Sequence, residues 1–69
     1  MSDSALDRLT AARSRAEAAS IYAELLLSQR LGLEIDWSTV NLILIEKWSR
    51  AGLRYIKDHA YKLAYPVKP

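Results

Sequence analysis

The stretch Leu31-Gly32-Leu33-Glu34-Ile35-Asp36-Trp37 carries the signals that end one helix and begin the next within a few residues. Glycine adopts the left-handed conformation that closes many helices, so Gly32 marks the end of the first helix. An aspartate before an apolar run is a common N-cap, so Asp36 marks the start of the second helix. Ile35 and Val40 are spaced for a hydrophobic staple across that cap. A connection this short favours two antiparallel neighbouring helices.

We predict the first helix over residues 4–31. Ser4 can cap its first turn, and Asp7 places a carboxylate near the positive end of the helix dipole. Small and apolar residues then recur at alternating spacings of four and three, which is a heptad pattern. They are Ala5, Leu9, Ala12, Ala16, Ala19, Ala23 and Leu26. Because alanine lets a neighbouring helix approach closely, we expect large side chains to pack on this stripe. These side chains are Trp37, Trp48 and Tyr55.

The second helix is predicted over residues 36–64, after a turn at 32–35. It should end before Pro66, since the residue before a proline avoids helical dihedral angles. Residues 66–69 then form an extended tail or the start of a linker. Gly52 lies in the middle of this helix, where it costs up to about 1 kcal/mol relative to alanine and permits a kink or a close helix crossing. The sequence thus predicts one all-α domain, residues 1–65, folded as an antiparallel two-helix hairpin.

Both predicted helices carry more apolar surface than a single partner helix can cover. The residues expected on these second faces are Ile21, Tyr22, Leu25, Leu42, Ile45, Leu53 and Ile56. Large apolar patches on a monomer usually mark an interface. We therefore expect a protein–protein interaction module that is completed to a four-helix bundle, either by forming a dimer or by docking onto a partner chain. If the inward and outward stripes are exchanged, the core and interface residues exchange too.

Composition narrows the classes of function. A chain of 69 residues is near the lower limit for an independent hydrophobic core, and the absence of cysteine removes disulfides and thiolate metal sites. One histidine cannot build the usual zinc site, and no serine or threonine has a base spaced to activate it. We expect no enzyme activity, metal or cofactor. No apolar run approaches the ~20 residues of a membrane span, and the polar start Met1-Ser2-Asp3-Ser4 does not fit a secretory signal. A soluble, intracellular protein, cytoplasmic by default, is expected.

Four basic residues form a strip on the second predicted helix: Lys47, Arg50, Arg54 and Lys57. The strip is either a solvated outer face or a contact surface for phosphates, which would make the chain a small basic regulator that binds nucleic acid. The net charge of only +2 is unlike that of a dedicated polycation. A third alternative is a docking domain of a larger multi-protein or multienzyme assembly, with the tail as a linker. The identity of the partner, and whether the chain is a fragment or an engineered sequence, stay open.

Overall fold

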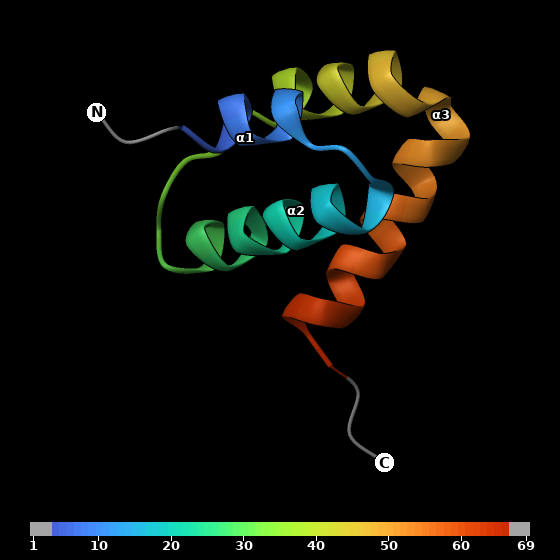
Figure 1. Ribbon diagram of the computed structural model, residues 1–69. Coiled ribbons are helices and arrows are strands. Elements are labelled where there is room, and N and C mark those ends of the chain that lie inside the picture. Colours follow the sequence, from blue (N-terminus) through green and yellow to red (C-terminus); the bar gives the residue numbers. More distant parts are fainter. Residues whose placement is uncertain (1–3, 67–69) are drawn as a thin grey trace.

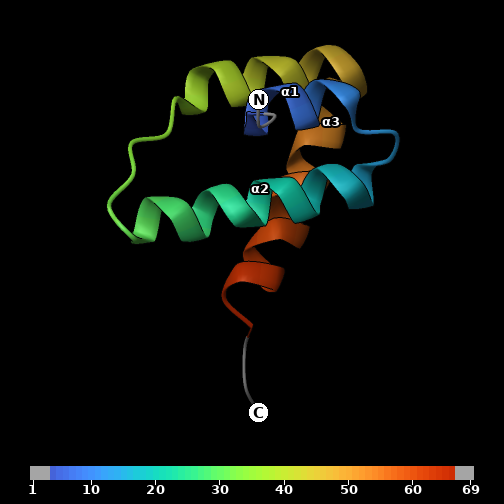
Figure 2. The same cartoon turned by 60° about the vertical axis from the view of Figure 1, so that its left-hand side comes forward.

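The computed structural model describes residues 4–66, which form three helices: α1 (Ala5–Ala11), α2 (Arg15–Arg30) and α3 (Trp37–Ala64). These residues contain no strand, so the predicted all-α class is confirmed for this part of the chain. In both views, α1 and the first half of α3 lie above α2, and the second half of α3 crosses α2 and extends beyond it (Figures 1 and 2). The predicted tail lies outside the described residues except for Pro66.

The connection between α2 and α3 has the predicted caps at both ends. Gly32 has a φ of 102°, and the Leu33 amide donates to the Ser28 carbonyl at 3.1 Å, as in a Schellman motif. At the start of α3, the Asp36 carboxylate accepts hydrogen bonds from the hydroxyl and the amide of Thr39, which lowers the pKa of Asp36. The two caps return the chain along α2, so the end of α2 and the start of α3 are confirmed.

The prediction of one continuous helix over residues 4–31 is wrong. The chain leaves helical geometry at Ala12 and begins a new helix after Ser14. The Ser14 hydroxyl accepts from the Glu17 amide, and the Glu17 carboxylate accepts from the Arg13 amide, each at 3.1 Å. Side chains therefore accept hydrogen bonds from one backbone amide in the first turn of α2 and from one just before it. This arrangement is closely related to a capping box. This new start lets α1 fold back along α2.

Polar contacts at the surface hold α1 against both other helices. The Arg8 guanidinium donates to both carboxylate oxygens of Glu24 on α2, at 3.0 and 2.7 Å, and this hydrogen bonding lowers the pKa of Glu24. From α3, the Lys47 Nζ donates to the Thr10 carbonyl at 2.7 Å. Thr10 lies in the last turn of α1, where a cation complements the negative end of the helix. α1 is therefore an integral part of the fold and packs its one fully buried residue, Leu9, against α2.

α3 is sharply bent at Ser49, which has φ 65° and ψ 179°. A straight helix of its 28 residues would be about 42 Å long, whereas the molecule extends 35 Å along its longest principal axis. Residues other than glycine rarely adopt this backbone conformation, which costs of order 1–3 kcal/mol. Gly52 makes room for the bend, because a Cβ atom at position 52 would overlap the Trp48 Cβ. A kink, which Gly52 permits, is therefore present three residues before the glycine.

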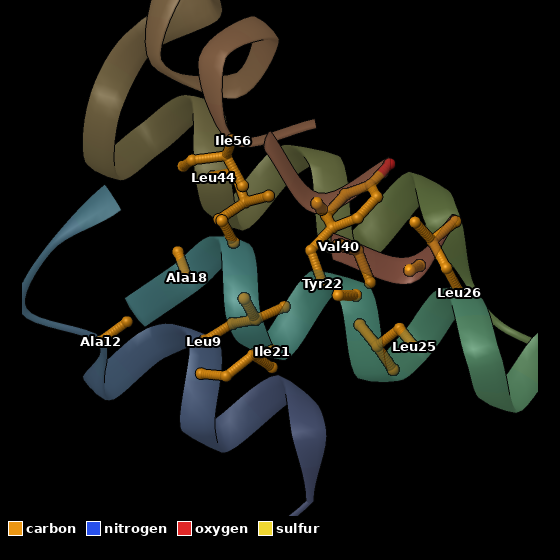
Figure 3. Close-up of a cluster of buried hydrophobic side chains, with 14 residues drawn as sticks. Leu9, Ala12, Ala18, Ile21, Tyr22, Leu25, Leu26, Val40, Leu44 and Ile56 are labelled. Atoms are coloured by element: carbon orange, nitrogen blue, oxygen red, sulfur yellow. The ribbon is translucent and has the colours of Figure 1, made fainter. Parts of the chain in front are cut away.

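Because of the bend, the chain covers most of the circumference of α2 by itself. Figure 3 shows Ile21 between α2 and α1, whereas Leu44 and Ile56, from the two halves of α3, lie on the opposite side of α2. The buried apolar residues are Leu9, Ala12, Ala18, Ala19, Ile21, Tyr22, Ala23, Leu25, Leu26, Val40, Leu44, Ile56, Ala60 and Ala64. The surplus apolar surface is consequently much smaller than the sequence predicts.

Candidate functional site: the interaction surfaces

Four of the seven residues predicted to face a partner lie inside the fold: Ile21, Tyr22, Leu25 and Ile56. For these four the prediction is wrong, because α1 and the bent α3 cover the faces that a simple hairpin leaves open. Of the other three, Leu42 is 57% exposed, and Ile45 and Leu53 are half-buried. The predicted interface is therefore divided between the core and the surface.

The predicted packing of large side chains on the alanine stripe also needs correction. Trp37 and Trp48 pack against the core while partly exposed, but Tyr55 is about half exposed and lies outside the core. The Arg15 guanidinium lies 4.9 Å from the centroid of the Tyr55 ring, and the His59 ring stacks on the same tyrosine. Ala16 is exposed. The stripe is interrupted because the helix predicted over this segment is broken between α1 and α2.

The bend divides the predicted basic strip. Lys47 precedes Ser49 and is engaged with the Thr10 carbonyl, so it belongs to the packing of α1. Arg50, Arg54 and Lys57 follow the bend and are all exposed on the second half of α3. We call these three residues the basic face.

The largest gathering of exposed apolar side chains lies where α2 ends. We call it the α2-end surface, and it consists of Leu27, Arg30, Leu31, Leu33, Tyr61 and Tyr65. Five of the eight large apolar side chains that are exposed in the described part of the chain belong to it. Leu31 is 86% exposed and Leu33 is 61% exposed. This clustering makes the α2-end surface the leading candidate for contact with another molecule.

The Schellman turn and the end of α3 assemble this surface from segments far apart in sequence. Leu31 and Leu33 flank Gly32, so the turn that closes α2 carries both leucines at its surface. The Arg30 guanidinium lies 5.5 Å from the Tyr65 ring centroid. The Tyr61 and Tyr65 rings, 6.1 Å apart, stack on each other. The arginine thus joins the end of α2 to the end of α3.

An aromatic row anchors the surface to the core. Burial raises the pKa of Tyr22 to about 12, and the nearby Tyr61 contributes to the rise. The Trp37 ring lies 4.9 Å from the Tyr22 ring, so aromatic contacts extend from the start of α3 through α2 towards the end of α3. Anchoring of this kind orders exposed side chains before a partner arrives, which lowers the entropy cost of binding.

The composition of the α2-end surface is that of a protein interface, in which tyrosine and arginine are enriched and often supply much of the binding energy. This surface was not predicted from the sequence. One signal was available. Leucines flank the turn glycine at positions where a solvent-facing turn normally carries polar residues.

Comparisons with protein-family models, with curated proteins and with solved structures gave no match. Across residues 4–66, no three histidine, aspartate or glutamate side chains converge as metal ligands would. Among the helices described above, none is long and apolar enough to cross a membrane.

Proposed function

We propose that the chain is a protein-association module that pairs with a second copy of itself through the α2-end surface. The observation that carries this proposal is the concentration of exposed leucine and tyrosine side chains around Arg30. Soluble monomers seldom leave large contiguous apolar patches uncovered, and small chains often gain stability by oligomerisation. Two-fold symmetric dimers are the commonest soluble oligomers.

The charges beside the leucines suit a two-fold arrangement. Arg30 lies at the end of α2, and Glu34 follows Leu33 in the connection; both are exposed. Within residues 4–66, Glu34 has no ion-pair partner of its own. Because a two-fold axis makes each surface meet its own copy, an Arg30 on one side can face a Glu34 on the other, twice per dimer. The leucines between them would supply the apolar centre.

The predicted four-helix bundle is not part of this proposal. Such a bundle needs the second faces of both helices to be open, and Ile21, Tyr22 and Leu25 are buried by the chain itself. Pairing at the end of α2 requires no rearrangement of the core. Docking onto a different chain uses the same surface, and a wild-type protein that stays monomeric would favour that alternative.

A charge-exchange experiment tests the proposal. Arg30→Glu and Glu34→Arg each place like charges across the axis, so each should weaken the dimer at least about tenfold, or ~1.4 kcal/mol. The double variant Arg30→Glu/Glu34→Arg restores opposite charges and should recover most of the affinity. Sedimentation equilibrium over a wide range of concentrations measures all three, with circular dichroism to confirm unchanged helix content.

Leu42→Glu is the matched control, because Leu42 is also more than half exposed but lies in the first half of α3, outside the α2-end surface. It should leave the association constant unchanged. A wild-type protein that sediments as a monomer throughout, or a double variant no better than the single ones, would refute pairing through this surface.

A further inference from the structure

The geometry points to a second binding surface: the basic face on the second half of α3, which we assign to the phosphate backbone of nucleic acid. Arg50, Arg54 and Lys57 are spaced by four and three residues, which places them on one side of the helix. They span about 10 Å along its axis. All three are exposed, and none forms an ion pair with a carboxylate of the described residues. This inference is independent of the proposed self-association.

The distribution of charge leaves this face without local neutralisation. Asp58 is the only acidic residue after position 49, and its carboxylate is already paired with Lys62 at 3.3 Å. The other acidic residues all precede the bend, whereas half of the basic residues follow it. The end of α3 also extends beyond α2 (Figure 1). A chain with little net charge thus presents a locally positive helix, which attracts polyanions.

The residues on this face favour nucleic acid over an acidic protein. The central part of a protein interface is depleted of charged residues and needs apolar side chains to bury, but the basic face offers no aliphatic residue. Contacts to a phosphate backbone come mainly from arginine and lysine, with hydroxyl groups in support. We infer binding without sequence preference, because these contacts do not read base edges.

Fluorescence anisotropy with a labelled DNA duplex and a labelled single strand, both at low salt, tests this inference. For three phosphate contacts, the affinity for duplex should fall about 40-fold between 50 and 200 mM salt, with a log–log slope near −2.7. The double variant Arg50→Gln/Arg54→Gln should bind at least about tenfold more weakly at low salt. Circular dichroism should show that its helix content is unchanged, because both side chains are exposed.

Arg13→Gln is the matched control, since it removes one positive charge at an exposed residue between α1 and α2, outside the basic face. It should weaken binding by no more than about twofold if the face, and not total charge, determines affinity. Leu31→Glu places a charge in the apolar centre of the α2-end surface and should prevent pairing. It should still bind DNA, so failure of one proposal is distinguishable from failure of the other. Absence of binding to either probe at low salt, a loss per removed charge in Arg13→Gln equal to that in Arg50→Gln/Arg54→Gln, or displacement by poly-glutamate as effective as by unlabelled duplex would each overturn the assignment.

Discussion

Gly52→Ala is expected to destabilise the protein by at least about 2 kcal/mol, because the added methyl group has no space beside Trp48. The overlap involves the Trp48 Cβ, which is fixed to the backbone and cannot rotate away. For a domain of this size, such a loss lowers Tm by roughly 10 °C or more. In an unbent helix the same substitution would raise stability by about 0.5–1 kcal/mol, since alanine is the better helix former. Thermal unfolding followed by circular dichroism therefore distinguishes the two geometries by the sign of the change.

Gly32→Ala serves as the comparison for this prediction. Gly32 has a positive φ, but no atom lies close to where its Cβ would be. Alanine there should cost only the penalty of the left-handed conformation, about 1–2 kcal/mol. A Gly52→Ala variant more stable than the wild type would show that α3 is not bent as described.

Leu25→Glu is expected to abolish folding of the isolated chain. Leu25 is 8% exposed, and its burial contributes about 1.5–3 kcal/mol. A glutamate there must also desolvate its carboxylate, at a cost of several kcal/mol, and it would lie in a hollow lined by Glu34 and Asp36. The total stability of a domain of this length is only about 3–10 kcal/mol. The circular dichroism spectrum should therefore lose most of its helical signal at 25 °C.

The matched substitution on the same helix end is Leu31→Glu, at a side chain that is 86% exposed. It should remain folded and lose only the ability to pair. This contrast separates the core from the α2-end surface. If Leu25→Glu stays helical and merely becomes monomeric, Leu25 faces a partner, as the hairpin hypothesis required.

Three helix ends were predictable from the sequence because each has a capping residue at the expected position. Ser4, Gly32 and Asp36 all occupy the capping positions that the sequence indicates. The break at Ser14 also had a signal, the spacing of Ser14 and Glu17, but the heptad of alanines running across it suggested one continuous helix. Because alanine favours helix in any packing, the alanine stripe said less about where a helix begins than the Ser14 cap did.

The bend was only partly predictable. Gly52 indicated that a kink was allowed, yet nothing about Ser49 favours a positive φ, and tertiary packing must impose it. α1 covers Ile21, and this one backbone angle explains why the interface prediction was also wrong for Ile56. It turns the second half of α3 onto α2, so Ile56 meets the core instead of a partner. The basic face, in contrast, followed from spacing alone, apart from Lys47.

The bend of α3 at Ser49 determines which apolar residues of its second half are buried and which surfaces remain open. Since the chain contains no cysteine, spin labels can be attached only at the introduced cysteines of a Ser38→Cys/Lys62→Cys variant, one in each half of α3. Both positions are exposed, so the labels should not disturb the core. In a straight helix these two positions would be about 36 Å apart. Pulsed electron–electron double resonance on dilute protein should give a label-to-label distance clearly shorter than this. A distribution centred near 36 Å would contradict the bend and return Ile56 to the surface.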